Sequence, residues 1–347
     1  MAQVNIFEEG RVANLSEEIN LVPNRWGVLQ NIGLFQSEYL TQKVAYVPRT
    51  VEGDNIIIDR NWEERRNAVQ EGKRDTLPIQ VPHFPLDDAI TPSDVDGRAD
   101  WTTVTDAGVR TESVDSVRAR KMARLRRAHA LTLDVARFQL LRDGTVYAPS
   151  GTVDIDFYDA YGVQREEVFF DLGNANANPN QHPSKVLGLM QDALGSSQTV
   201  SRVVAVASPG FFNKLIGNPF VYEAYQYFQQ PQGSELLSGR LVDDQNGPLY
   251  RRFTYGGIDF IEVRGEVGGE PLVEDDKAYA FPLGTNTFRT YYSPAHRLTH
   301  VNTVAMESYY FEYPNEKDDI IEIMSETNFL NAALVPDAIV TLNAADE

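Results

Sequence analysis

The sequence predicts an α+β fold that consists of more than one structural unit. Three observations support this prediction. Residues 114–142 have the apolar spacing of one long helix, residues 44–88 have the pattern of a hairpin with a charged tip, and residues 145–310 mix helix and strand patterns. With 347 residues and a hydrophobic content of 42%, the chain can form two units, or one elongated unit with appendages.

Composition excludes several classes of protein. The chain has no cysteine, which excludes disulfides, thiolate metal sites and cysteine nucleophiles, and which fits a reducing compartment such as a bacterial cytoplasm. No run approaches the ~18 continuous apolar residues of a membrane span. Residues 1–9 have neither the basic start nor the apolar core of a signal peptide. The net charge of −19 opposes tight nucleic-acid binding, because an acidic surface repels phosphate.

The N-terminal part of the chain leads from residues 1–43, which have no clear period, into a hairpin. Strand patterns occur at 44–47, 55–59 and 77–81, and the tip between the last two is highly charged. Such a hairpin has too little apolar surface to hold itself in place, so it is either a loop that packs on a neighbouring molecule or a flexible surface loop. The candidate contact residues of the hairpin are Trp62, Gly72, Lys73 and Arg74.

Residues 87–111 are polar and predict a connector, and the long helix follows them. Ser113 can cap this helix, and Gly144 is a signal for its end. Residues 114–142 would form a helix ~43 Å long at 1.5 Å per residue, which suggests a structural spine. The predicted apolar stripe is Val114, Val117, Met122, Leu125, Leu131, Val135, Phe138 and Leu141.

The first half of this helix also carries a cluster of cations in an acidic chain. No Lys or Arg follows Lys317, so charge is segregated along the sequence, which favours subunits that recognise one another in a fixed order. The cations are either a solvated face or a surface that meets the acidic surface of a neighbour. The cluster consists of Arg118, Arg120, Lys121, Arg124, Arg126 and Arg127.

Residues 145–310 are expected to form a separate α/β unit. Its predicted elements are a helix over 182–195, a strand over 202–207, helices after Ser208-Pro209 and Asn218-Pro219, and a Gly-Gly hairpin over 252–263. Two further strands are expected at 320–324 and 338–342.

Catalytic and metal-binding motifs are not evident. The chain has no phosphate-binding loop, no GxSxG elbow, no HExxH and no GxGxxG. His296 and His300 are four residues apart but lack a third ligand nearby. Residues 94–100 suggest a calcium loop, yet Gly97 stands two positions early for an EF-hand. We therefore predict no catalytic residues, no cofactor and no metal.

Five stretches, taken in order, carry a resemblance to a known family. They are residues 38–50 (EYLTQKVAYVPRT), 138–147 (FQLLRDGTVY), 203–222, 281–295 and 313–340. Their order and spacing resemble the major capsid proteins of lambda-like tailed bacteriophages, which have the Hong Kong 97-type capsid fold.

This resemblance implies a domain organisation. It implies an N-terminal arm (1–43), an extended β-hairpin loop (44–88), a peripheral domain (89–148 with 309–347) that contains a spine helix over 114–142, and an axial domain (149–308). The arm is too short to include a scaffolding domain.

The resemblance also implies a function. The subunit would assemble with itself, in the bacterial host cytoplasm, into the hexamers and pentamers of an icosahedral head that encloses double-stranded DNA and contacts it weakly. A separate scaffolding protein, a portal and a maturation protease are implied, and a decoration protein is an option. No membrane takes part.

Two other interpretations remain open at this point. An encapsulin-like cellular nanocompartment has the same fold and also lacks catalytic residues, but it would form a small uniform shell without a portal. A soluble acidic enzyme would purify as a monomer of about 39 kDa. Electron microscopy of the purified protein separates these possibilities.

Overall fold

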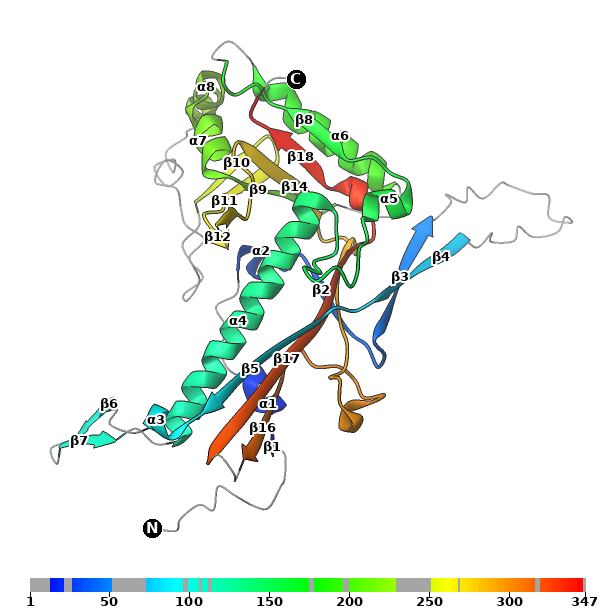
Figure 1. Ribbon diagram of the computed structural model, residues 1–347. Helices are drawn as coiled ribbons and strands as arrows, with labels where there is room; N and C mark the ends of the chain where they lie inside the picture. The colour runs from blue at the N-terminus through cyan, green and yellow to red at the C-terminus, as the bar shows by residue number, and fades with distance from the viewer. Residues whose placement is uncertain are drawn as a thin grey trace, which may run out of the picture.

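The computed structural model describes residues 13–21, 27–51, 73–95, 99–105, 108–111, 114–174, 178–195, 200–228, 251–267, 269–315 and 319–345. Two six-stranded sheets are its main elements, and one long helix runs along the first sheet and ends beneath the second (Figure 1). The molecule is therefore α+β, as the sequence predicts.

The first sheet is long and thin. Its order is β1-β16-β17-β15-β2, and β5 pairs with the remaining edge of β17. Ser325 in the middle of β17 thus has Leu86 of β5 on one side and Tyr310 of β16 on the other. The strands are β1 (Ala13–Asn14), β2 (Gln36–Tyr39), β5 (His83–Ile90), β15 (Phe288–Tyr292), β16 (Tyr309–Asn315) and β17 (Ile320–Ala333).

Helix α4 (Val114–Asp143) covers one face of this sheet. Its 30 residues give a length of ~45 Å. The chain leaves the helix at Gly144, whose φ of +73° lies in the left-handed region that glycine adopts without strain. Short helices α1 (Ser16–Leu21) and α3 (Pro92–Val95) lie beside its first half. The predicted helix over 114–142 is confirmed to within one residue.

The second sheet has the order β10-β11-β9-β14-β18-β8. Helices α6 (His182–Leu194), α7 (Pro209–Gly217) and α8 (Pro219–Phe228) pack on one face of it. Both Ser-Pro and Asn-Pro signals are confirmed, because α7 and α8 each begin at the proline. The strands are β8 (Glu166–Phe169), β9 (Arg202–Ala207), β10 (Arg252–Tyr255), β11 (Ile258–Glu262), β14 (Lys277–Leu283) and β18 (Val340–Asn343).

One core joins the two sheets. The other face of the second sheet packs on the end of α4, on α2 (Val28–Ile32) and on the base of the hairpin made by β3 (Val44–Val51) and β4 (Lys73–Gln80). Helix α5 (Phe157–Tyr161) closes this core at its margin. The end of α4 is therefore embedded in the core, while its first half packs on the first sheet and on α1 and α3.

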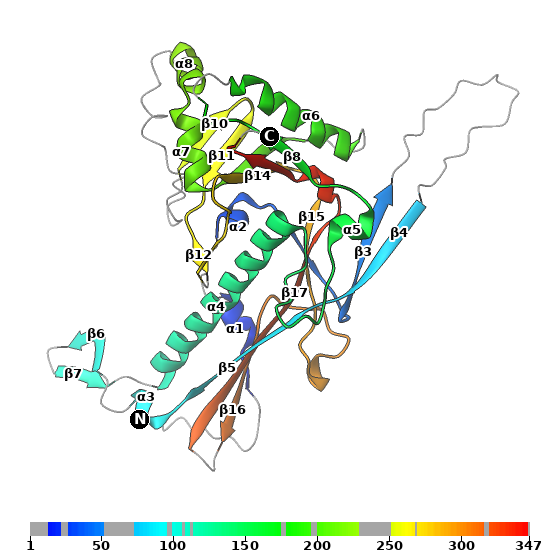
Figure 2. The same cartoon turned by 45° about the horizontal axis from the view of Figure 1, so that its top comes forward.

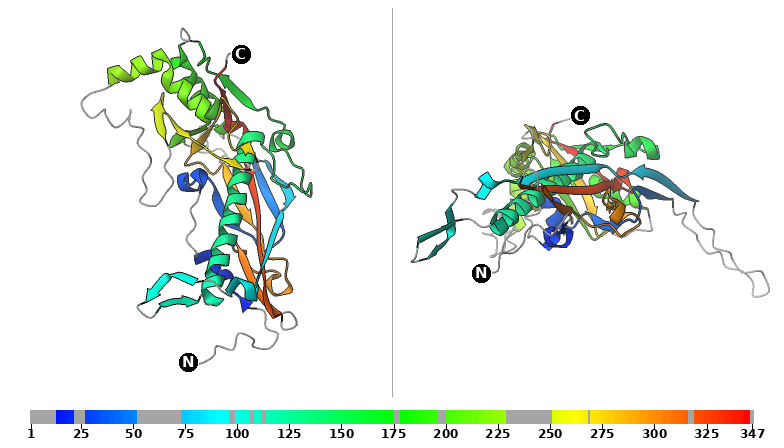
Figure 3. Two further views of the ribbon diagram at one scale, coloured as in Figure 1. Left: turned by 60° about the vertical axis from the view of Figure 1, so that its left-hand side comes forward. Right: turned by 60° about the horizontal axis from the view of Figure 1, so that its bottom comes forward.

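Two hairpins extend away from this body on opposite sides, β3–β4 and the pair β6 (Ala99–Thr105) and β7 (Gly108–Thr111) (Figures 2 and 3). Each pairs only with itself among the described strands. The remaining small elements are β12 (Glu266–Val267), β13 (Glu270–Pro271), η1 (Pro179–Gln181), η2 (Leu298–His300) and η3 (Pro336–Ala338). No described helix is long and apolar enough to cross a membrane.

The predicted connector over 87–111 is wrong. This region contains the second half of β5 and both strands of the β6–β7 hairpin. Acidic residues and prolines hide the alternation of β5, and its stability comes from pairing with β17, more than 230 residues later in the chain. The predicted strand over 320–324 is likewise too short, because β17 runs on to Ala333.

Two strands pair with strands outside the domain to which the resemblance assigns them. β15 lies within residues 149–308, yet it pairs with β17 in the first sheet. β18 lies within 309–347, yet it pairs with β14 and β8 in the second sheet. Strand pairing between segments distant in sequence decides both placements.

Candidate functional site

The six predicted cations lie on the first half of α4, in two different environments. Three of them, Arg118, Lys121 and Arg126, are turned toward the sheet and have acidic partners within the chain. The other three, Arg120, Arg124 and Arg127, are exposed. The sequence predicts one surface, and the structure divides it into two.

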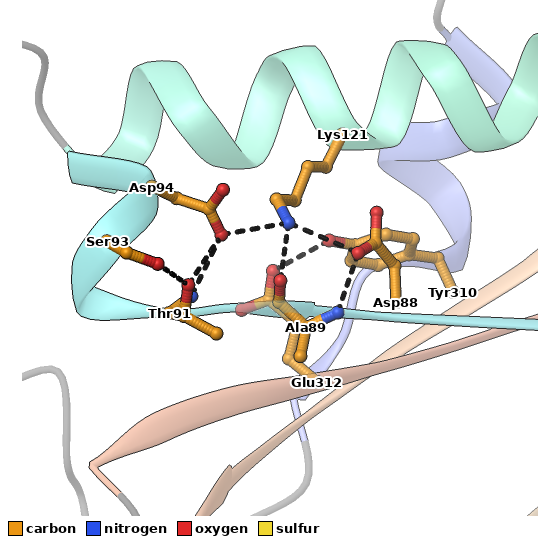
Figure 4. Close-up of polar contacts among 8 residues, drawn as sticks. All are labelled: Asp88, Ala89, Thr91, Ser93, Asp94, Lys121, Tyr310 and Glu312. Carbon is orange, nitrogen blue, oxygen red and sulfur yellow. Dashed lines mark hydrogen bonds and ion pairs between the residues drawn. The ribbon is translucent and has the colours of Figure 1, made fainter. Parts of the chain in front are cut away.

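Lys121 binds the β5 side of the first sheet (Figure 4). Its Nζ lies 3.1 Å from Asp88 Oδ1 and 3.1 Å from Asp94 Oδ2, and it also donates to the backbone carbonyl of Ala89. The side chain is only 13% exposed. Lys121 thus ties α4 to the end of β5 and to the turn that follows.

Hydrogen bonds within the turn that contains Asp94 hold its carboxylate in place for this contact. The backbone N–H and the hydroxyl of Thr91 donate to Asp94 Oδ2 at 3.1 and 3.0 Å. These bonds, the backbone one first, together with the adjacent Lys121 lower the pKa of Asp94 to about 2. The carboxylate is therefore charged throughout the ordinary pH range.

Arg118 and Arg126 bind the strand on the other side of β17. Arg118 Nε donates to Glu312 Oε1 at 2.8 Å, and the same oxygen accepts from the Tyr310 hydroxyl at 3.0 Å. Arg126 is 5% exposed and donates to Ser308 Oγ at 2.6 Å and Glu307 Oε2 at 2.7 Å. These contacts hold α4 to β16 and to the residues just before it.

Two further ionisable groups of α4 are buried without an obvious sequence signal. His129 is 4% exposed, and its Nε2 lies 2.6 Å from Ser325 Oγ. Burial, with a contribution from Arg126, lowers the pKa of His129 to about 4. The imidazole is therefore neutral at pH 7.

The second buried group is Arg137, which is 1% exposed in the core between the sheets. It donates to Thr290 Oγ1 at 3.2 Å and to Gln30, and its guanidinium lies 4.9 Å from the centre of the Phe35 ring. Neighbouring Asp134 has its pKa raised to about 6 by burial, against the opposing effect of Arg137. The hydrogen bond from Arg137 to Gln30 connects α4 to α2.

Four of the exposed residues of α4 form a stripe. Arg120, Arg124, Arg127 and Leu131 follow at steps of four, three and four, which keeps them on one face of a helix. Leu131 is 51% exposed, so its predicted place in the apolar stripe is wrong. Within the described part of the chain, Arg124 and Arg127 have no ion pair. This face can bind an acidic partner.

The extended-loop residues are described only in part. Lys73 and Arg74 begin β4, where they pair with Val51 and Thr50 of β3. Trp62 and Gly72 lie outside the described residues. The base of the hairpin is anchored in the joint core by buried side chains at Ala45, Val47, Ile79 and Val81.

Comparison with known proteins identifies the chain. A family model described as phage major capsid protein E matches residues 11–344. The chain belongs to this family. It is 36% identical over 346 residues to the major capsid protein of Pseudomonas phage KPP10 and 27% identical over 359 residues to that of Salmonella phage Felix O1. In both cases 96% of each chain is covered.

Solved structures share the fold. The putative capsid protein of a prophage of E. coli CFT073 aligns with a TM-score of 0.54 and 12% identity, over 95% of this chain and 99% of the other. A phage-related protein of Bordetella bronchiseptica RB50 aligns with a TM-score of 0.51 and 11% identity, over 91% and 92%. At such identities the similarity shows the fold alone.

The chain is thus a phage major capsid protein with the Hong Kong 97-type fold, a structural component of the virion head shell and not an enzyme. These matches favour the phage capsid over the alternative of an encapsulin-like compartment. Its functional surfaces are surfaces of assembly.

The sequence alone does not show which acidic residues bind these cations. Asp88, Glu307 and Glu312 lie 33, 181 and 194 residues from the cations that they bind. No local spacing could reveal these pairs, because they form only once β5 and β16 flank β17.

The two histidines considered as a metal pair serve other contacts. His300 lies against the rings of Tyr309 and Phe311, at 5.4 and 5.3 Å between centres, and His296 contacts Lys43. Among the residues that the structure describes, no group of three His, Asp or Glu side chains is arranged to hold a metal ion.

Proposed function

We propose that this subunit closes into the pentamers and hexamers of an icosahedral phage head around packaged double-stranded DNA. Family membership supports the shell, and the form of the subunit supports the way in which it closes. A long first sheet with one covering helix and a second sheet with three helices give an elongated subunit with large lateral surfaces. Such surfaces suit ring closure by head-to-tail contacts.

The isolation of the β3–β4 hairpin from the other described strands is the main support for this proposal. Its two eight-residue strands pair only with each other among the described strands, and Tyr46 on β3 is 58% exposed. An isolated two-stranded ribbon is marginally stable in water, so a neighbour that covers it would stabilise it. We infer that the hairpin is the extended loop of the fold and acts on an adjacent subunit.

Deletion of the hairpin tip tests this role. Replacing residues 61–72 with a short Gly-Ser linker leaves β3, β4 and their buried base intact. We expect the purified variant to remain a folded, soluble subunit, while the wild-type chain forms closed shells in electron micrographs. Heat-stable shells from the variant would contradict the proposal.

The remaining partners are those that the resemblance to the family implies. We propose that a separate scaffolding protein, a portal and a maturation protease act with this subunit, and that a decoration protein is optional. The Arg120, Arg124 and Arg127 stripe and the loop residues around Lys73 are the proposed assembly contacts. Assembly would take place in the cytoplasm of the bacterial host.

Packaged DNA is expected to be held without tight binding, because the genome must leave the head. The net charge of −19 repels phosphate at long range. The purified subunit should bind duplex DNA weakly near physiological salt, in an electrophoretic or fluorescence assay. Sub-micromolar binding with a steep salt dependence would show instead that α4 is a nucleic-acid surface.

A further inference from the structure

An apolar pocket of about 410 Å³ lies between β5, α4 and the segment that follows α4. Phe84 forms part of its wall, stacked on Tyr147 with 5.9 Å and on Phe329 with 4.7 Å between ring centres. The lining contains no Asp, Glu, Lys or Arg. It consists of Pro82, His83, Phe84, Pro85, Leu86, Ala128, His129, Thr132, Tyr147, Ala148, Pro149, Ser150 and Thr152.

One arginine of α4 stands at the rim of this pocket. Ala128 lines the pocket, and Arg124 stands one helical turn before it. Arg127 follows Arg124 three residues later on the exposed face of the helix, further from the pocket. An apolar pocket with Arg124 at its rim and Arg127 beyond it fits an apolar side chain that is flanked by carboxylates. Duplex DNA fits such a surface poorly, since it offers phosphates without an apolar group to fill the pocket.

Helix α1 presents a matching surface on the same chain. Leu21 is 81% exposed, and Glu17 and Glu18, four and three residues before it, are exposed on the same face. Ile19 on the opposite face is completely buried and packs in the cluster that includes Met122 of α4. The exposed leucine therefore stands on a helix that is firmly fixed to the body.

The pocket and the α1 face lie on opposite flanks of α4. The pocket is on the β5 flank, where Lys121 binds Asp88. Helix α1 is on the β16 flank, where Asn20 donates to the Ser308 carbonyl at 3.0 Å and Arg126 binds Ser308 Oγ. One subunit thus has the two complementary surfaces on opposite sides, as a contact that joins successive copies around a ring requires.

We propose that α1 of one subunit docks at the α4 pocket of a second copy, with Leu21 in the pocket and Glu17 and Glu18 against Arg124 and Arg127. The proposal rests on the proposed self-assembly and names one of its contacts. The contact is heterologous, so it propagates from copy to copy until the ring closes.

Introduced cysteines test this contact directly, because the chain has none of its own. Leu21→Cys and Ser150→Cys place one thiol on α1 and one on the pocket wall. Shells co-assembled from the two single variants should give disulfide-linked dimers on a non-reducing gel, which only a contact between copies can produce. Shells of the double variant should give a ladder that ends at five and six subunits.

The matched control pairs Ser150→Cys with Tyr222→Cys, an exposed position on α8 in the second sheet unit. This pair should give no ladder. If well-formed shells of the Leu21/Ser150 pair also give none, or if Leu21→Cys alone gives dimers, the proposed contact is overturned. If the wild-type chain forms no shells at all, the proposed function fails, and this result is distinguishable from the first two.

Charge exchange gives an independent test. Arg124→Glu with Arg127→Glu should abolish shell formation, and adding Glu17→Lys and Glu18→Lys should restore it, with subunit unfolding unchanged throughout. Restoration by the fourfold variant supports the contact. Normal empty shells from the double arginine variant, with a loss of DNA packaging alone, would overturn it and assign the stripe to DNA.

Discussion

The two sides of α4 carry the same type of residue in opposite environments. On the side that faces the sheet, Arg126 is 5% exposed and bound to Glu307 and Ser308. One residue further on, Arg127 is exposed and has no ion pair to any described residue. A turn of about 100° around a helix axis is enough to convert a cation from a structural tie into a surface charge.

This difference separates two tasks that a shell subunit must perform. The inward cations connect α4 to β5 and β16, so they determine whether the thin first sheet and its helix stay together. The outward cations contribute little to that, because an exposed charge is solvated by water in the folded and in the unfolded chain alike. Stability and assembly should therefore respond to different variants of one helix.

Arg126→Ala should give the largest effect. It leaves the Glu307 carboxylate and the Ser308 hydroxyl without their buried donor, and removing one partner of a buried ion pair costs ~3–5 kcal/mol. Because Glu307 is 29% exposed, we expect the lower end, ~3 kcal/mol of unfolding free energy in urea titrations of the subunit. Arg127→Ala is the control, with a change within ~0.5 kcal/mol. Equal effects of both variants would contradict the difference between the two sides of α4.

The second largest effect should be a loss of subunit stability in acid, caused by His129, which also faces the sheet. Its folded pKa of about 4 lies below the ordinary value of 6.5, so the unfolded chain binds the proton first. His129 does not reduce the unfolding free energy above pH 6.5. As the pH falls from 6.5 toward 4, the unfolding free energy decreases, by roughly 2–3 kcal/mol at pH 4.5.

His129→Gln isolates this term, because an amide can still bond to Ser325 but does not titrate. The control is needed because the raised pKa of Asp134 acts in the opposite direction. That carboxyl gains its proton first in the folded chain, so it adds stability as the pH falls through about 6. Urea unfolding at pH 7 and 4.5 should show a smaller loss for the variant. An identical loss in both proteins would contradict the role of His129.

Sequence patterns predicted those parts of the fold that depend on nearby residues. The limits of α4 follow from its apolar spacing and from Gly144, and α7 and α8 begin where Ser208-Pro209 and Asn218-Pro219 place them. What failed was the connector over 87–111, where β5 is a strand only because β17 pairs with it. Local propensity contains no information about such a partner.

The candidate site shows the same limit. The six cations on α4 could be found by counting charges, but which of them face the sheet could not. The predicted stripe shows why: it included Leu131, which is 51% exposed, while His129 and Arg137, both polar, are buried. Polar residues can be buried where a specific hydrogen-bond partner is present. Here the partners are Ser325 for His129 and Thr290 for Arg137, and both lie far away in the sequence.

Lys121→Met should have an intermediate effect. The methionine keeps most of the apolar stem but removes the ammonium group that faces Asp88 and Asp94, both about one fifth exposed. We expect a loss of ~1.5–2 kcal/mol of unfolding free energy, the lower part of the ~1.5–3 kcal/mol that hydrogen bonds to charged groups contribute, because both carboxylates are partly solvated. Asp94→Asn in the same background should then cost less than it does in the wild type. Fully additive losses would mean that the two side chains do not interact in solution.

Arg124→Ala should have the smallest effect on subunit stability, and it tests most directly whether the two faces of α4 have different roles. The side chain is exposed, so its removal should change the unfolding free energy by no more than ~0.5 kcal/mol. A shell repeats every contact in all of its subunits, so a term too small to measure in one chain can decide whether a ring closes. We therefore expect normal urea unfolding together with fewer shells in sedimentation and electron microscopy.

Higher salt should weaken assembly of the wild type more than that of the variant, because the wild type retains the charge that salt screens. A variant that unfolds early yet assembles normally would place Arg124 on the structural side of the helix and erase the distinction between its two faces.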